Sequence, residues 1–446
     1  MGSSCPPRAR PHGAENMRTG GGRGAEQLTS SDIWHLGTRA SMLVSVVACS
    51  GRELAAVEAD PSWRLGDLLA AVPEQEKAAG HKLRILFGGA ELCGDATLGE
   101  IGVQGGSELT LVVIRRRRIV TCAWAVAKVW DADSGECLRT LEGHRFLPVR
   151  SAVISADGQR VLTASEDRTA KIWAADSGQC LRTLEGHWRH VCSAVFSADG
   201  QRVLTASWDM TAKIWAADSG ECLRTLAGHE GPVCSAVFSA DGQRVLTASW
   251  ETAKIWAVDS GECLRTLAGH RRDVTSAVFS ADGQRVLTAS EDRTAKIWAA
   301  DSGACLRTLE GHRFDVCSAV FSADGQRVLT ASRDMTAKIW AADSGACLRT
   351  LEGHRFDVTS AVFSADGQRV LTASEDETAK IWAADSGQCL RTLEGHRDRV
   401  NSAVFSADGQ RVLTTSDDGT ARIWDADSGE CLRTLEGAGD RACFAP

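Results

Sequence analysis

Histidine, threonine, aspartate and tryptophan recur together at a fixed spacing along most of this chain. Two examples of the set are His144, Thr163, Asp167 and Trp173, and His312, Thr330, Asp334 and Trp340. Such side chains could ligate a metal or relay hydrogen bonds. Each unit contributes one histidine at the same place in that unit, so the histidines do not meet at a common centre. This spacing argues against a metal site. A buried indole N–H needs an acceptor, so we expect a structural hydrogen-bond network in each unit.

One unit departs from this rule. Its turn, Ser249-Trp250-Glu251-Thr252, is one residue shorter than the others and has no aspartate. His229 is therefore left without its carboxylate. We predict that this unit, which ends at Trp256, is the weakest of the array.

The tryptophans mark a repeat. Seven near-copies of one sequence end at tryptophans spaced by 42, 41, 42, 42, 42 and 42 residues: Trp173, Trp215, Trp256, Trp298, Trp340, Trp382 and Trp424. Each copy contains the same four runs typical of strands or close variants of them, SAVFS, RVLTAS, AKIWA and CLRTLE, separated by ADGQ, a short polar turn and an Asp-Ser-Gly turn. Four short strands in about 42 residues predict one blade of a β-propeller.

The repeat resembles that of WD-repeat β-propellers, which carry Gly-His before the first strand, Ser or Thr on the second, Asp in the turn and Trp on the third. The resemblance implies an all-β propeller with seven complete four-stranded blades plus a partial eighth, over residues 119–446. The partial copy, 119–141, contains Trp130 but lacks a first strand. Seven blades is the commoner outcome in this family. We favour eight, because the C-terminal GAGDRACFAP could supply the missing strand and leave fewer unpaired edges.

Residues 42–114 have a different pattern, a β-β-α-β-β order with a short amphipathic helix at 65–71. The stretches MLVSVVACSG, LRILFGGAEL and TLGEIGVQGGSELTLVV resemble ubiquitin-like domains, which implies a small α+β (β-grasp) fold. Residues 1–41 are rich in Gly, Arg, Pro and Ser and predict a disordered tail. The four arginines at 115–118 are either a nuclear-import signal or a basic linker, and we favour the linker.

The ubiquitin-like resemblance implies an apolar partner-binding patch at Leu86 and Val112, where Cys49 replaces the third large apolar residue. The last strand runs on into the arginines with no Gly-Gly terminus, so conjugation through this end is excluded. Ubiquitin-reading or proteasomal proteins are the partners that this patch suggests. The alternative is a folded spacer without a partner.

Differences between the near-identical copies concentrate in two places, after the Gly-His and in the turn between the second and third strands. In the propeller geometry that the resemblance implies, both open on one face. Our candidate partner-binding residues there are Arg145, Phe146, Trp188, Arg189, Trp208, Trp250, Arg271, Arg313, Phe314, Arg333, Arg355, Phe356 and Arg397. Arg, Trp and Phe dominate binding hot spots. Neutral drift is the alternative, but SADGQ is unchanged in all seven complete copies.

Composition limits the remaining classes of function. The 446 residues are 43% hydrophobic and 24% charged, with a formal net charge of −8. This balance gives no general affinity for nucleic acid or for anionic membranes. The 16 cysteines include no CxxC pair. We expect them to be reduced and buried, in a monomeric cytoplasmic protein that could also be nuclear.

These observations favour a non-enzymatic protein-interaction scaffold that needs no cofactor and no metal. The propeller would bind a protein or peptide, and the ubiquitin-like domain would recruit a second partner. The alternative is a substrate-recognition subunit of a ubiquitin ligase or a proteasome-linked adaptor. Propellers that are recruited to cullins carry a Trp-Asp-x-Arg signature after the third strand. Here Ala-Ala-Asp follows Trp173, and this departure argues against the ligase alternative. No catalytic constellation stands apart from the repeat.

Overall fold

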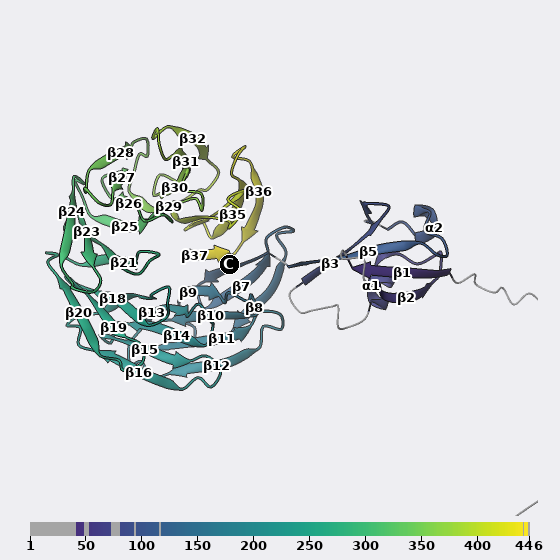
Figure 1. Ribbon diagram of the computed structural model, residues 1–446, viewed down its shortest axis with the longest axis horizontal. Coiled ribbons are helices and arrows are strands. Elements are labelled where there is room, and N and C mark those ends of the chain that lie inside the picture. The colour runs from purple at the N-terminus through teal and green to yellow at the C-terminus, as the bar shows by residue number, and fades with distance from the viewer. Residues whose placement is uncertain are drawn as a thin grey trace, which may run out of the picture.

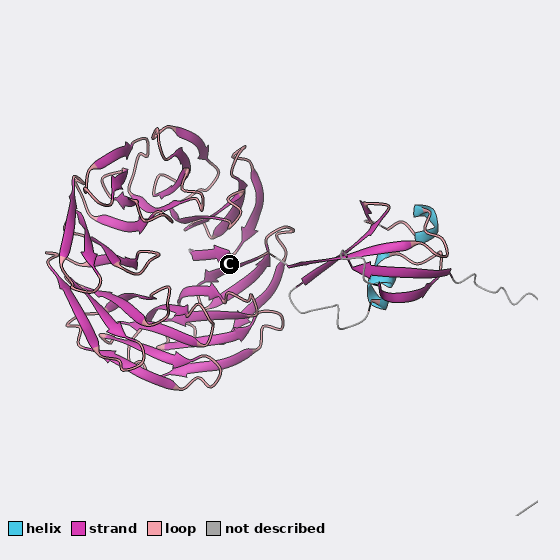
Figure 2. Ribbon diagram, viewed as in Figure 1, coloured by secondary structure: helices cyan, strands magenta, loops and turns pink. Residues whose placement is uncertain are grey.

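The computed structural model describes residues 42–48, 53–72, 81–92, 95–115, 117–439 and 441–444. A ring of β-sheets is joined to a smaller α+β module (Figure 1). Within the described residues, helices occur only in the smaller module (Figure 2). The tail predicted at 1–41 lies outside the described residues.

The smaller module is a five-stranded sheet with two short helices. Its strands follow the order β2-β1-β5-β3-β4, and β1 and β5 are parallel. The elements are β1 (Met42–Ala48), β2 (Glu53–Ala59), α1 (Leu65–Ala71), β3 (His81–Phe87), β4 (Ala90–Glu91), α2 (Leu98–Ile101) and β5 (Glu108–Arg115). Alternate strand residues such as Val44, Val46 and Ile85 are buried with Leu68 of α1. This arrangement is the β-grasp that the sequence predicts.

The ring consists, in the described part of the chain, of eight four-stranded antiparallel sheets. The innermost strands are β9 (Val149–Ile154), β13 (Val191–Phe196), β17 (Val233–Phe238), β21 (Val274–Phe279), β25 (Val316–Phe321), β29 (Val358–Phe363), β33 (Val400–Phe405) and β37 (Arg441–Phe444). The second strands are β6 (Arg118–Ala123), β10 (Arg160–Ser165), β14 (Arg202–Ser207), β18 (Arg244–Ser249), β22 (Arg285–Ser290), β26 (Arg327–Ser332), β30 (Arg369–Ser374) and β34 (Arg411–Ser416).

The third strands carry the repeated tryptophans, and the fourth lie on the perimeter of the ring (Figure 1). The third strands are β7 (Val126–Asp131), β11 (Thr169–Ala174), β15 (Thr211–Ala216), β19 (Thr252–Ala257), β23 (Thr294–Ala299), β27 (Ala337–Ala341), β31 (Ala379–Ala383) and β35 (Thr420–Asp425). The fourth are β8 (Cys137–Glu142), β12 (Cys180–Glu185), β16 (Cys222–Ala227), β20 (Cys263–Ala268), β24 (Cys305–Glu310), β28 (Cys347–Leu351), β32 (Cys389–Leu393) and β36 (Cys431–Glu436). We name each blade by the tryptophan of its third strand.

Blades adhere through apolar faces. Leu329 and Ile339 of the Trp340 blade (β25–β28) pack against Val370 and Trp382 of the Trp382 blade (β29–β32). Equivalent clusters lie between the other blades, so the core of the ring is a series of interfaces. Because each blade buries its apolar faces on its neighbours, stability comes from stacking, as in other repeat proteins.

An arginine at the start of the second strand also joins most blades to the next. Arg327 donates to the carbonyl of Gly367 at 2.7 Å and to Asp385 at 3.3 Å. Its guanidinium also lies 5.3 Å from the centroid of the Phe363 ring. Charge-assisted hydrogen bonds and a cation–π contact together fix the spacing of neighbouring blades. We call this group the arginine clamp.

The C-terminal strand completes the ring. β37 pairs with β6, with Phe444 opposite Ile119, so the Trp130 blade consists of β37, β6, β7 and β8. Arg411 of the preceding blade donates to Asp133 at 2.8 Å, which gives this junction its own clamp. The partial copy at 119–141 and the chain end therefore form the eighth sheet, the arrangement that the sequence favours.

The expected linker at 115–118 requires a correction. Arg115 ends β5 and Arg118 begins β6. Arg118 is buried and donates to the carbonyl of Gly158 at 2.9 Å, and it also pairs with Asp176. This arginine is part of the clamp between the Trp130 and Trp173 blades. Counting basic residues could not reveal that role, because the partners lie in another blade.

Candidate protein-binding face

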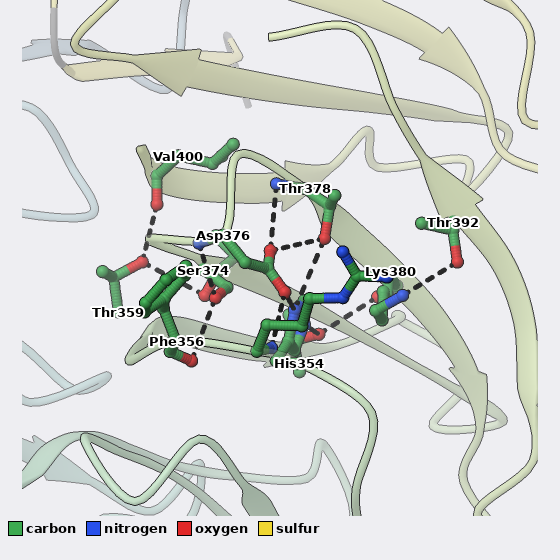
Figure 3. Close-up of polar contacts among 12 residues, drawn as sticks. His354, Phe356, Thr359, Ser374, Asp376, Thr378, Lys380, Thr392 and Val400 are labelled. Atoms are coloured by element: carbon green, nitrogen blue, oxygen red, sulfur yellow. Dashed lines mark hydrogen bonds and ion pairs between the residues drawn. The ribbon is translucent and has the colours of Figure 1, made fainter. Parts of the chain in front are cut away.

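The Trp382 blade shows how an intact unit holds its loops (Figure 3). The Trp382 indole donates to the Thr372 hydroxyl at 2.9 Å. His354 Nε2 lies 2.7 Å from the same hydroxyl, and its Nδ1 lies 2.9 Å from Asp376. This series of hydrogen bonds runs from β31 through β30 to the loop after Gly353, so it links three segments of the blade. A buried chain of this kind fixes the relative positions of two loops.

The aspartate is the most heavily used group of this network. Asp376 accepts from the backbone N–H of Arg355 at 2.9 Å and from the Thr378 hydroxyl at 2.6 Å, besides its contact with His354. Burial alone would raise the pKa of the Asp376 carboxyl, but hydrogen bonds from His354 and Thr378 outweigh burial and hold that pKa well below its usual range. The carboxylate therefore stays ionised and keeps both loops in place.

A glycine is required where the loop leaves the fourth strand. Gly353 has φ of 144°, and a Cβ there would lie 3.4 Å from the Trp382 ring. The following His354 can then turn inward over the indole, with ring centroids 6.1 Å apart. The positive φ therefore explains the glycine of the Gly-His pair, since a side chain at this position would be strained.

The same network is present in the units of His144, His187, His270, His312 and His396. In the first, His144 lies 2.9 Å from Asp167 and 2.8 Å from Thr163, to which Trp173 donates at 2.9 Å. His312 lies 2.8 Å from Asp334 and 2.7 Å from Thr330, which accepts from Trp340 at 2.9 Å. The side chains of each set form hydrogen bonds with one another. These side chains therefore position the loops and are not themselves exposed for binding.

The loops that these networks hold lie at one face of the ring, which we call the loop face. It comprises the loop after each Gly-His and the turn between the second and third strands. A direct link is the Ser374 hydroxyl, which donates to the carbonyl of Phe356 at 3.2 Å. Every exposed aromatic side chain among the described residues lies here: Trp124, Phe146, Trp188, Trp208, Trp250, Phe314 and Phe356. Exposed aromatic groups gathered on one face are typical of binding sites.

Most residues expected at the binding face are exposed on it. Phe146 is 89% exposed, Phe314 57% and Phe356 58%. Arg145, Arg271, Arg313, Arg355 and Arg397 are also exposed. Within the described part of the chain, the guanidinium groups of these five arginines form no ion pair, so they remain available to a partner.

Two candidates are engaged within the protein. The Arg333 guanidinium lies 3.0 Å from Asp315 and 3.9 Å from Asp357, carboxylates from its own and the next blade. The Arg189 guanidinium lies 4.9 Å from the Trp188 ring centroid. A partner of Arg333 must compete with two acidic groups. Arg189 and Trp188 instead form one composite surface.

Trp124 is a member of this face that sequence reasoning missed. It lies in the turn between β6 and β7 and is 73% exposed. Trp208 and Trp250 occupy the corresponding turns of complete copies. Aligning the partial copy with the complete ones would have identified Trp124. Leu147, Met210 and Met335 enlarge the apolar part of the same face.

The Trp256 blade (β17–β20) lacks the carboxylate of the network. Trp256 still donates to Thr247 at 2.7 Å, and His229 Nε2 lies 2.6 Å from that hydroxyl. His229 Nδ1 and the Ser249 hydroxyl are buried and have no hydrogen-bond partner among the described residues. Burial, reinforced by the positive charge of Lys254, lowers the pKa of His229 to about 4. The imidazole is therefore neutral at physiological pH.

The expectation of buried cysteines is wrong for the fourth strands. Cys137, Cys180, Cys222, Cys263, Cys305, Cys347, Cys389 and Cys431 are free and exposed. The fourth strand is the outermost of each blade, so half of its side chains face solvent. Cys122 of β6 is buried as expected. No group of three or more His, Cys, Asp or Glu residues that could hold a metal occurs among the described residues.

The patch expected on the smaller module is partly described. The register pairs Leu86 with Thr110 and Arg84 with Val112, which places Leu86 and Val112 on the same face of the sheet. Leu86 is half-buried. The side chain of Val112 and residue Cys49 lie outside the described residues.

No described helix is long and apolar enough to cross a membrane.

Comparisons with known proteins match these two parts of the chain. Over 75 residues, 17% of the chain, it is 31% identical to "Ubiquitin-like protein NEDD8" of Dictyostelium discoideum, of which it covers 96%. The family described as "WD domain, G-beta repeat" matches residues 135–174, 178–216, 220–257, 261–299, 303–341, 345–383 and 387–425, more than half of the chain. Neither match indicates a catalytic activity. The chain therefore belongs to the WD-repeat β-propeller family and carries an N-terminal ubiquitin-like domain.

Proposed function

We propose that this protein is a non-enzymatic scaffold whose loop face binds a protein or peptide and whose ubiquitin-like domain recruits a second partner. WD-repeat propellers support a role in protein interaction. The observation that carries the proposal is the confinement of all exposed described aromatic groups to the loop face. Large aromatic side chains beside unpaired arginines supply the strongest contacts in protein interfaces.

The test is affinity purification with a variant of the loop face. Phe314→Ala and Phe356→Ala together remove two exposed rings from neighbouring blades without changing the buried network. The matched control is Gln326→Ala with Gln368→Ala, which alters exposed residues of the SADGQ turns in the same blades. We expect the first pair to abolish partner capture and the control to retain it. Equal capture by both variants would contradict the proposal.

A second candidate function is a ubiquitin-linked adaptor, in which the ubiquitin-like domain delivers the propeller's partner to ubiquitin-reading or proteasomal proteins. The match to the ubiquitin-like protein favours this role, and few residues separate the end of β5 at Arg115 from the start of β6 at Arg118. A variant lacking residues 42–114 should lose such partners and keep those of the loop face. Loss of both sets would show that the domains do not act independently.

A further inference from the structure

The loop face holds side chains in a strained backbone conformation. Within the described part of the chain, every residue with a positive φ that is not glycine lies on this face and is exposed. The φ angles of these residues range from 27° to 74°, where a residue with a Cβ is strained. Such strain persists only where the surrounding structure imposes it, and it concentrates at functional sites. The residues are Trp124, Phe146, Arg168, Met210, Trp250, Arg293, Met335 and Glu377.

The turns on the opposite face show how this chain otherwise meets the same backbone requirement. They join the first strand to the second and the third to the fourth, and their left-handed position is glycine in every described copy, with φ from 65° to 79°. At Gly242, no described atom lies within 4 Å of an added Cβ, so the backbone conformation alone accounts for the glycine. Met335 on the loop face has a φ of 67°, against 66° at Gly242. The side chain of Met335 is therefore kept in a conformation for which this chain otherwise uses glycine.

The turn around Met335 does not need this side chain in order to form. The backbone N–H of Asp334 donates to the Ser332 hydroxyl at 3.1 Å, and Asp334 accepts from the N–H of Thr336 at 3.1 Å and from its hydroxyl at 2.6 Å. These hydrogen bonds fix the residues on both sides of Met335 and so impose its conformation. The Trp424 blade has the same arrangement, but there the position is Gly419, with φ of 80°. Because the turn accepts glycine, the side chain of Met335 serves something other than the fold.

Three consecutive blades present three different chemistries at this position. From the Trp298 blade (β21–β24) to the Trp382 blade, the strained residues are Arg293, Met335 and Glu377, with φ of 73°, 67° and 68°. Met335 is 44% exposed, and the exposed rings of Phe314 and Phe356 belong to the same blade and to the next one. Arg293 and Glu377 are exposed and form no ion pair within the described part of the chain. The three turns therefore offer a cation, an apolar surface and an anion in this order.

We propose that these three turns recognise a partner segment that carries an acidic, an apolar and a basic side chain in matching order. The acidic group pairs with the Arg293 guanidinium, which can bind a carboxylate through two parallel hydrogen bonds. The apolar side chain packs on the flexible thioether of Met335, which adapts to different shapes. The basic group pairs with Glu377. This proposal rests on the loop face being a protein-binding surface and assigns a ligand chemistry to one part of it.

The first test uses the full chain and a series of blocked peptides in which one, two or three glycines separate Asp from Leu and Leu from Lys. The chain has five methionines, so the ¹³C-methyl signal of Met335 can be followed individually. We expect a peptide of this series to shift that signal. Replacing its Asp by Asn, its Leu by Ser or its Lys by Gln should weaken binding about tenfold. Absence of a shift at every spacing would overturn the proposal, and equal binding of a replaced peptide would overturn the contact that the replacement removes.

The second test separates binding from folding. Met335→Gly relieves the strain, so the protection of residues 327–341 against hydrogen exchange should rise about threefold, while peptide binding measured by titration calorimetry should fall about tenfold. The matched control, Gly242→Met, adds the same side chain at an equal φ on the opposite face. It should lower the protection of residues 233–249 about threefold and leave peptide binding unchanged. Protection that does not rise in Met335→Gly, or peptide binding that persists in it, would overturn the inference.

The same variant distinguishes this inference from the proposed function. If partner capture is lost with Phe314→Ala and Phe356→Ala but retained with Met335→Gly, the loop face remains the binding surface and only the contact at Met335 is overturned. Loss of capture in both variants would support the contact. Capture that persists in both would contradict the proposed function itself.

Discussion

The Trp382 and Trp256 blades differ in one turn and show which interactions build the scaffold and which position its loops. β30 and β31 pair as far as Ala373 and Ala379, whereas β18 and β19 continue to Ser249 and Thr252. The shorter turn thus tightens the hairpin and leaves the strand register intact. Apolar packing on both neighbours is also retained. The buried polar network therefore fixes the loop face, while the sheets form without its complete set.

The two blades also differ at their junctions. Arg202, which reaches toward the Trp256 blade, pairs with Asp259 at 3.2 Å. No atom of the described residues lies within 4 Å of a Cβ at Gly242, whereas Arg327 lies 2.9 Å from one at Gly367. The arginine clamp at this junction is therefore looser. One blade combines a looser clamp on one side with an incomplete network, and its being the weakest of the ring stays a prediction.

The largest effect is expected from breaking the intact network. Asp376→Ala leaves His354 Nδ1 and the Arg355 N–H without an acceptor and should lower the free energy of unfolding of the Trp382 blade by about 3 kcal/mol. Hydrogen exchange of residues 369–383 measures this local opening. The control is Glu377→Ala, an exposed change in the same turn. A loss no larger than that of the control would show that the network contributes little.

Repairing the incomplete blade is the reverse experiment. Inserting the Trp-Asp-Met-Thr turn at 250–252 should stabilise the Trp256 blade by about 2 kcal/mol, because His229 and Ser249 regain partners. Protection of residues 244–257 against hydrogen exchange should rise toward that of residues 369–383. If the inserted turn left protection unchanged, the unpaired groups would not be the cause of weakness.

Removing the arginine clamps from two different junctions should produce a smaller difference in stability. Arg327→Met keeps much of the apolar stem but removes the hydrogen bond to Gly367 and the contact with Phe363, at a cost of about 1 kcal/mol. Arg202→Met should cost less, since the contact of the Arg202 guanidinium among the described residues is the exposed one with Asp259. Urea unfolding of the two variants measures the difference. Equal losses would refute the difference between the junctions.

A further expected effect is a local dependence of stability on pH. The lowered pKa of His229 means that its neutral form stabilises the blade fully above the unfolded value of about 6.5. This contribution is lost as pH falls through 6.5 toward 4. The lowered pKa of Asp376 has its effect only below the unfolded aspartate value of about 3.9. Between pH 7 and pH 5, the protection against exchange should therefore fall more at 252–257 than at 379–383, and the repaired turn should abolish this difference.

The features that the sequence predicted correctly are those that depend on residues close together in the chain. Alternation and turn chemistry located the strands, and the missing residue beside Trp250 identified the incomplete network before any contact was known. Contacts between blades could not be predicted from the sequence, because the partners of Arg118, Arg202 and Arg333 lie in other repeats. The fourth-strand cysteines were placed wrongly, since composition does not say which strand faces solvent. Pairing of β37 could only be favoured, because its four residues lack the SAVFS pattern.

The pairing of β37 with β6 makes the ring dependent on the order of synthesis. β6 is made before every complete blade, yet its inner partner is made after all of them. Until residues 441–444 emerge, β6 exposes an unpaired edge to the nascent chain and its surroundings. Closure is then a late, long-range pairing, which we expect to be slower than the formation of any hairpin. A ribosome stalled within the last blade would hold a chain of folded blades whose first sheet is still open to other strands.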